Sequence, residues 1–102
     1  MFGLLDRDVE YLQESLKNFR EIEKAVIFGS RALGNYKKGS DVDIALFGTN
    51  ITPGTISRLA FQLNEESPLP YFFDLLHYEQ INNPKLKQHI LSIGKELYCK
   101  KD

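Results

Sequence analysis

The sequence predicts an α+β fold, a sandwich in which a small mixed β-sheet has helices packed mainly on one face. Short apolar runs typical of strands alternate along the chain with longer segments whose apolar residues recur at helical spacing. The length of 102 residues suits one domain with one core, and no repeat or Pro-, Gly- and Ser-rich linker divides it. We therefore expect residues 1–102 to form a single domain.

The first half of the chain is expected to form a helix and two strands. Apolar residues at three- and four-residue steps predict an amphipathic helix over about 5–20. The run KAVIF, residues 24–28, is typical of a buried strand. Residues 30–40 are polar and contain two glycines, so they form a loop, which we expect to open with a helical turn. In DVDIALF, residues 41–47, every second residue is apolar, which predicts a strand with one apolar face.

The second half is expected to form two more helices and two more strands. Apolar spacing predicts a helix around 56–63, which the segment ESPLP ends. The aromatic run YFFDLLHY, residues 71–78, is typical of a third strand. Asn83 followed by proline predicts a capped helix that ends at Gly94, and KELYC, residues 95–99, predicts a last short strand.

Composition excludes several classes of protein. Thirteen basic and fourteen acidic residues give a net charge of −1, which is not typical of a general nucleic-acid binder. No apolar run approaches the ~20 residues of a membrane span, and the N-terminus becomes acidic too early for a signal peptide. The single cysteine, Cys99, leaves no internal disulfide. We expect a cytoplasmic protein without membrane contact.

Three aspartates are candidate metal ligands. Asp41 and Asp43 are two residues apart on a predicted strand and therefore project from the same face. At an effective dielectric constant near 20, two such carboxylates repel by about 3 kcal/mol, unless a divalent cation such as Mg²⁺ or Mn²⁺ lies between them. Asp74 lies within an apolar strand, where a charge is costly unless it is paired. If the two strands are neighbours, three carboxylates can hold two metal ions suited to phosphoryl transfer.

A glycine–serine turn precedes the aspartates. Gly29 and Ser30 end the first predicted strand, and backbone N–H groups at such a junction suit phosphate oxygens, while Arg31 could add positive charge. A plain loop with a serine cap is the alternative for these residues alone. The two histidines, His77 and His89, lie at no zinc-ligand spacing, so we expect surface or strand-end positions for both.

The segment GSRALGNYKKGSDVDIALF, residues 29–47, resembles the G-S-x(~9)-S-D-x-D signature of the DNA polymerase β-like nucleotidyltransferase superfamily, and in particular its minimal nucleotidyltransferases. The resemblance implies the polymerase β-like palm fold and transfer of a nucleoside monophosphate with release of pyrophosphate. It implies that two Mg²⁺ ions, or Mn²⁺, are bound by the catalytic residues Asp41, Asp43 and Asp74, and that the third of these also helps to activate the acceptor hydroxyl. It implies that the nucleotide, ATP or another NTP, is bound by Gly29, Ser30, Arg31 and Ser40.

The size of the chain leaves no residues for a separate domain that grips the base or the acceptor. That surface would come from another chain, through self-association or a partner. The resemblance implies a small helical HEPN-domain partner, a toxin whose tyrosine hydroxyl receives AMP from ATP, with this chain as the antitoxin. Two alternatives remain open: an antitoxin that acts by contact alone without catalysis, and a transferase for a small-molecule acceptor.

Overall fold

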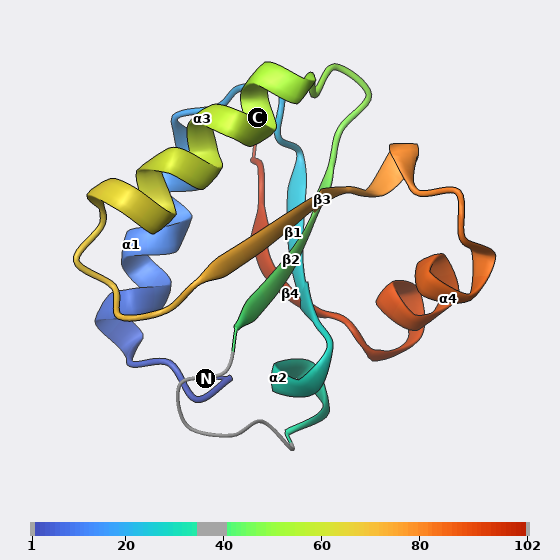
Figure 1. Cartoon of the computed structure of the whole chain (residues 1–102), viewed down its shortest axis with the longest axis horizontal. Helices are drawn as coiled ribbons and strands as arrows, with labels where there is room; N and C mark the ends of the chain where they lie inside the picture. Colours follow the sequence, from blue (N-terminus) through green and yellow to red (C-terminus); the bar gives the residue numbers. More distant parts are fainter. Residues whose placement is uncertain (1, 35–40, 102) are drawn as a thin grey trace.

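A mixed four-stranded sheet in the order β3-β2-β1-β4 forms the centre of the computed structural model, which describes residues 2–34 and 41–101 (Figure 1). Strand β1 pairs antiparallel with both β2 and β4, whereas β2 and β3 run parallel. The predicted mixed sheet is confirmed, and each strand lies within two residues of its predicted bounds. The strands are β1 (Lys24–Phe28), β2 (Val42–Phe47), β3 (Phe73–His77) and β4 (Lys95–Cys99).

Helices lie on both sides of this sheet. Figure 1 shows α1 and α3 on one side and α4 on the other. A π-helical turn, η1, extends α3, and a 3-10 turn, η2, follows β3. In the described parts of the chain, no helix is long and apolar enough to cross a membrane. The elements are α1 (Asp6–Lys17), α2 (Ser30–Leu33), α3 (Pro53–Phe61), η1 (Gln62–Glu66), η2 (Tyr78–Gln80) and α4 (Pro84–Ile93).

The larger core lies between the sheet and the helices α1 and α3. The alternation predicted for β2 is confirmed, because its apolar residues at even positions, from Val42 to Leu46, are fully buried in this core. The apolar stripes of α1 and α3 supply the opposite side of the core. Buried residues of this core, from α1, α3, β1 and β2, include Leu12, Leu16, Ala25, Ile27, Ile44 and Leu59.

A smaller core lies on the other face, under α4. Ile90 of α4 packs there against Val26 and Phe28 of β1 and Ala45 of β2. Most of the helical packing is therefore on one face, as predicted, and α4 closes part of the second face. Residues at odd positions of β2, including Asp43, point toward this second face because successive strand residues alternate.

Both ends of α4 are determined by local contacts. The Asn83 side chain accepts hydrogen bonds from the N–H groups of Lys85 and Leu86, which confirms the predicted cap. Gly94 follows the helix with a φ of −58°, so backbone freedom is not the reason for glycine here. A Cβ at Gly94 would collide with Val26 Cγ1 and with the Ile90 carbonyl oxygen. Glycine at this position lets α4 end in close contact with β1.

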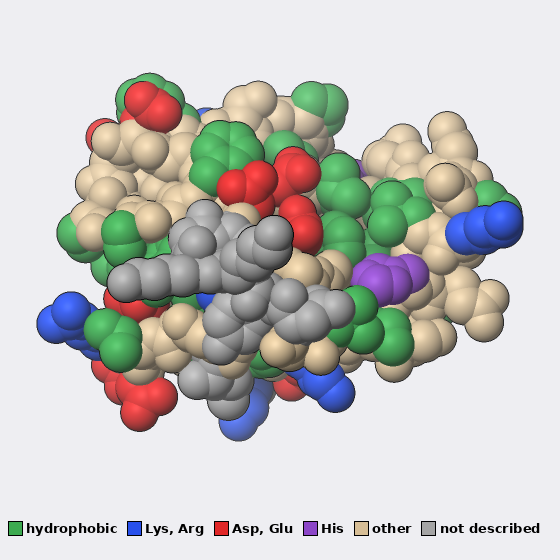
Figure 2. Space-filling model, turned by 60° about the horizontal axis from the view of Figure 1, so that its bottom comes forward, with side chains coloured by type: hydrophobic (Ala, Val, Ile, Leu, Met, Phe, Trp, Pro, Cys, Tyr) green, Lys and Arg blue, Asp and Glu red, His purple; other side chains and the backbone are tan. Residues whose placement is uncertain are grey.

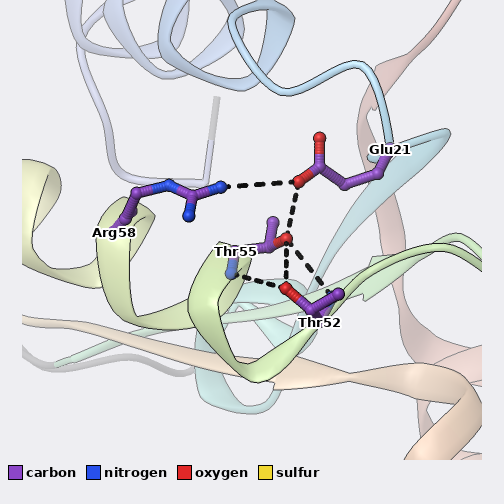
Figure 3. A network of polar contacts seen from close by, with 4 residues as sticks. All are labelled: Glu21, Thr52, Thr55 and Arg58. Carbon is purple, nitrogen blue, oxygen red and sulfur yellow. Dashed lines mark hydrogen bonds and ion pairs between the residues drawn. The ribbon is translucent and has the colours of Figure 1, made fainter.

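A polar network holds the start of α3 against the segment that precedes β1 (Figure 3). The Thr55 hydroxyl donates a 2.6 Å hydrogen bond to Glu21 Oε2, and Arg58 Nη2 lies 3.8 Å from the same oxygen. The Thr52 hydroxyl caps the helix by accepting from the Thr55 N–H. The hydrogen bond from Thr55 is the main reason why the pKa of Glu21 is lowered, and Arg58 lowers it further.

Candidate active site

Asp43 and Asp74 are register partners on the adjacent parallel strands β2 and β3. Partners in register project from the same face of a sheet, so the two carboxylates lie on the α4 face. Asp43 is half-buried, and Asp74 is exposed. The expectation that Asp74 bears a burial cost was wrong, because β3 is an edge strand and water reaches that position. The condition for a shared carboxylate cluster, that the strand of Asp74 adjoins the strand of Asp43, is met.

The three aspartates are close enough to interact electrostatically. Asp41 immediately precedes β2 and is exposed. Burial raises the pKa of the Asp43 carboxyl, the negative charges of Asp74 and Asp41 raise it further, and His89 opposes these effects. Figure 2 shows acidic side chains gathered near the middle of one face of the molecule. Negative charge is thus concentrated where β2 and β3 begin.

The donor set suits a hard divalent cation, since it consists of carboxylate oxygens. Among residues 2–34 and 41–101, no group of three acidic, histidine or cysteine side chains is close enough to form a ready metal cluster. Burial is the main cause of the raised pKa of Asp43, and repulsion from Asp74 and Asp41 adds to it. The residues fit a cation by their chemistry.

The turn at Gly29 lies directly against Asp43. Gly29 has φ 74° and ψ −151°, a conformation that is almost confined to glycine. A Cβ at this position would lie 2.6 Å from Asp43 Oδ2. The reason for glycine is therefore both the backbone conformation and the space that the carboxylate occupies. The expected proximity of the glycine–serine turn and the aspartates is confirmed for these two residues.

His89 of α4 belongs to the same site, although the sequence led us to expect a surface or strand-end position. Its Nε2 accepts a 3.2 Å hydrogen bond from the Gly29 N–H, and its ring meets the Phe28 ring edge to face at 6.2 Å. One signal in the sequence could have located it. Position 89 is three residues after Leu86 and four before Ile93, which places it on the apolar stripe of α4.

His77, in contrast, occupies the expected strand-end position. Its Nε2 lies 2.8 Å from the carbonyl oxygen of Gly48 and 3.1 Å from Glu79 Oε1. Glu79 also accepts from the Gly48 N–H. These contacts hold the end of β3 against the turn after β2.

The remaining predicted nucleotide-binding residues have different surroundings. Ser30 begins α2 directly after Gly29 and is half-buried. Arg31 is buried, and its Nη1 donates a 2.9 Å hydrogen bond to the Phe2 carbonyl oxygen, while its guanidinium lies 5.0 Å from the centre of the Tyr71 ring. These contacts tie α2 to the N-terminal segment and to the segment before β3. Ser40 lies outside the described residues.

Solved structures of similar fold include three toxin–antitoxin structures. A toxin–antitoxin with AMP-PNP has a TM-score of 0.73 and 23% identity, over 95% of this chain and 76% of that one. The toxin–antitoxin MntA-HepT has a TM-score of 0.70 and 21% identity, over 94% and 74%. A tri-AMPylated Shewanella oneidensis HEPN toxin in complex with MNT antitoxin has a TM-score of 0.65 and 23% identity, over 98% and 74%. At these identities the similarity establishes the fold.

The family was established from the sequence. No curated protein matches the chain. The profile of the family described as "Polymerase beta, Nucleotidyltransferase" matches residues 10–102, which include the Gly29 turn and all three aspartates. The match extends over nine-tenths of the chain and agrees with the arrangement of sheet, turn and carboxylates. The chain belongs to the polymerase beta nucleotidyltransferase family.

Proposed function

We propose that this protein is a Mg²⁺-dependent nucleotidyltransferase that transfers AMP from ATP to a hydroxyl, a tyrosine of a HEPN-domain toxin, and acts as the antitoxin of that pair. Membership of the family supports nucleotidyltransferase activity in general. The observation that carries the proposal is the placement of Asp43 and Asp74 in register on parallel strands, with the Gly29 turn against the first of them. Mutually repelling carboxylates beside a strained glycine have no evident structural use.

Each residue of the site has a proposed role. Ser30 and the Gly29 turn would receive the β- and γ-phosphates, and Asp41 and Asp43 would bind the metal ions together with Asp74. Arg31 and Ser40 stay as predicted nucleotide-binding residues. Arg31 contacts Phe2 and Tyr71, so its contribution would be to hold α2, which follows the Gly29 turn, in place.

The proposed reaction is an in-line displacement at the α-phosphorus of the nucleotide. The acceptor hydroxyl oxygen forms a bond to this phosphorus, the bond to the oxygen that bridges to the β-phosphate breaks, and pyrophosphate leaves. Asp74 takes the hydroxyl proton and later releases it to water. Two Mg²⁺ ions, or Mn²⁺, when bound, would neutralise phosphate charge and favour an ionised acceptor oxygen.

The surroundings of Asp74 favour an acceptor on another protein. The carboxylate is exposed, so the hydroxyl of a second chain can reach it. Two large apolar side chains are also exposed: Phe72, two residues before Asp74, is 56% exposed, and Leu33, at the end of α2, is 52% exposed. Single exposed apolar side chains are common on protein surfaces, so it is the exposure of Asp74 that supports this choice. The similar folds found in HEPN toxin complexes, one of them tri-AMPylated, support this choice of partner.

The test combines this protein, ATP, Mg²⁺ and the small helical protein that co-purifies with it. Intact-mass spectrometry would follow both chains. We expect the partner to gain the mass of one or more AMP groups with the wild-type protein and none with Asp43→Asn. Asp6→Asn, a change of an exposed aspartate in α1, is the matched control and should leave transfer unchanged.

Two other outcomes would favour the alternatives. Tight binding and neutralisation of the partner without any mass change would indicate an antitoxin that acts by contact. Release of pyrophosphate only when a small hydroxylated compound is supplied would indicate a small-molecule transferase.

A further inference from the structure

His89 is the one ionisable side chain of α4 that contacts the Gly29 turn in the described structure. It lies sixty positions from Gly29 in the sequence, and its Nε2 accepts the Gly29 N–H at 3.2 Å. The signature that relates this chain to nucleotidyltransferases, residues 29–47 with Asp74, does not include it. Its position is set by the neighbouring Ile90, which is buried against the sheet.

The Gly29 turn requires contacts that hold its backbone conformation and an acceptor for its N–H. Its backbone conformation is sparsely populated, and such conformations persist only where the surroundings hold them. Gly29 follows the last residue of β1, so its N–H is beyond the sheet ladder and receives its acceptor from α4 instead. Gly29 is half-buried, so its N–H without an acceptor would cost about 1 kcal/mol, the lower end of the range for a buried group. His89 therefore both satisfies the amide and determines how the peptide is oriented.

The orientation of this peptide controls the place of Asp43. The Asp43 carboxylate packs against the Gly29 Cα, close enough that a Cβ there would collide with it. The Phe28 ring, which precedes the turn, is also in contact with the His89 ring. Phe28 and Asp43 are paired residues of β1 and β2. One imidazole thus contacts the two residues, Phe28 and Gly29, that flank the central carboxylate.

We propose that His89 is a positioning residue of the candidate site: by holding the Gly29 N–H it keeps the turn in the conformation that directs the Asp43 carboxylate toward Asp74. The inference rests on the proposed function in so far as this carboxylate is taken to bind the catalytic metal. In this proposal Gly29 contributes its backbone conformation and its lack of a side chain, because its N–H is already hydrogen-bonded to His89.

The first experiment needs no catalysis. NMR of the full chain would compare wild type with His89→Ala, which removes the acceptor, and His89→Gln, whose amide oxygen can accept from the same N–H. We expect exchange of the Gly29 amide with solvent to be at least about tenfold faster in His89→Ala, and the Asp43 side-chain carbon signal to move. His89→Gln should restore both. Gln88→Ala, at an exposed neighbouring position of α4, is the control and should change neither.

The second experiment measures Mn²⁺ binding through the broadening of the Asp41, Asp43 and Asp74 signals. Loss of a residue that orients a ligand typically weakens metal binding or activity about tenfold or more. We expect that loss for His89→Ala, with recovery in His89→Gln. If AMP transfer is observed, kcat should fall in parallel, whereas the KM for ATP should change less. Thermal melting of each variant would confirm that it is folded.

The outcomes separate this inference from the proposed function. A Gly29 amide that is unprotected in the wild-type protein, or Asp43 signals that do not move in a folded His89→Ala variant, would overturn the role of His89, whatever the protein catalyses. Changed Gly29 and Asp43 signals in a protein that transfers no nucleotide would uphold the positioning role and refute the proposed transferase. If Mn²⁺ does not bind the wild-type protein, the exchange rate of the Gly29 amide and the Asp43 side-chain signal alone decide whether His89 is a positioning residue.

Discussion

Asp43 and Asp74 face the same side of the sheet at equivalent positions of two adjacent parallel strands, although thirty-one residues separate them in the sequence. Parallel pairing places both near the starts of their strands, beside the turn that ends β1. Burial and, after it, the charges of Asp74 and Asp41 raise the pKa of Asp43, so the ionised carboxylate is unfavourable there, and a bound cation would favour it instead.

Asp43→Asn should abolish transfer and yet stabilise the metal-free fold. The folded-state pKa of Asp43 lies above its ordinary value of 3.8, so the ionised carboxylate costs stability at neutral pH. Water reaches Asp74, so we expect a gain of only about 1 kcal/mol, or roughly 4 to 8 °C in Tm. The gain should be present at pH 7 and should disappear as the pH falls below 3.8, where Asp43 is protonated in both states. Melting with chelator across pH would measure it, and a lower Tm for the variant at pH 7 would contradict the argument.

Gly29→Ala should harm the site more than an ordinary glycine substitution does. The combination of φ 74° and ψ −151° costs about 1 to 3 kcal/mol with any side chain, and the new Cβ would push the Asp43 carboxylate away. Gly34→Ala is the matched control, because Gly34 has a φ of 82° and no neighbouring atom within 4 Å. We expect a smaller backbone cost at Gly34, whose ψ of 4° places it in the left-handed αL region, and loss of Mn²⁺ binding and transfer in Gly29→Ala alone.

A double mutant would test the same contact. Adding Asp43→Ala to Gly29→Ala removes the carboxylate with which the new Cβ collides. The double variant should therefore be more stable than the sum of the two single changes in the free energy of unfolding predicts. Strict additivity of the free energies of unfolding, measured in urea, would mean that the collision is relieved in some other way.

Thr55→Val should destabilise the protein at neutral pH and reduce its sensitivity to acid. The substitution removes the 2.6 Å hydrogen bond to Glu21, which is worth about 1.5 kcal/mol for a charged and partly exposed acceptor. Because this bond lowers the pKa of Glu21, its contribution is complete above the ordinary value of 4.5 and is lost as the pH falls through the lower folded-state value. Urea unfolding at pH 7 and at pH 3 should therefore show a smaller difference between wild type and variant at pH 3.

Glu21→Gln provides the control for that pH dependence. An amide at position 21 cannot ionise, so the variant should lose the same acid-sensitive part of the stability. Equal pH slopes for wild type, Thr55→Val and Glu21→Gln below pH 5 would contradict the assignment of this network.

Gly94→Ala should destabilise the fold by about 1 to 3 kcal/mol through overpacking. The added methyl group would meet Val26 and the Ile90 carbonyl oxygen, and it could be accommodated only if α4 moved away from β1. Gly54→Ala in α3 is the control, because its Cβ would make ordinary contacts at 3.5 Å. That control should melt at or slightly above the wild-type temperature, since alanine favours helix. Equal effects of the two substitutions would indicate that α4 is free to shift.

Much of the fold and part of the site could be predicted because the responsible signals are local. Apolar periodicity located every strand to within two residues, and the Asn83–Pro84 pair located the start of α4. The signature residues Gly29, Asp41 and Asp43 lie within fifteen positions of one another, so their proximity follows from a turn and a strand.

Contacts between distant segments could be settled only by the tertiary structure. The sequence by itself determined the elements, the apolar face of β2 and the spacing of the first two aspartates, because these depend on neighbours along the chain. Strand order decided that β3 is an edge strand, so Asp74 is exposed, and the packing of Ile90 decided that His89 reaches the Gly29 N–H. The physical reason is that burial and hydrogen-bond partners depend on which elements pack together, and a pattern within one segment carries no information about the segment on the other side of the contact.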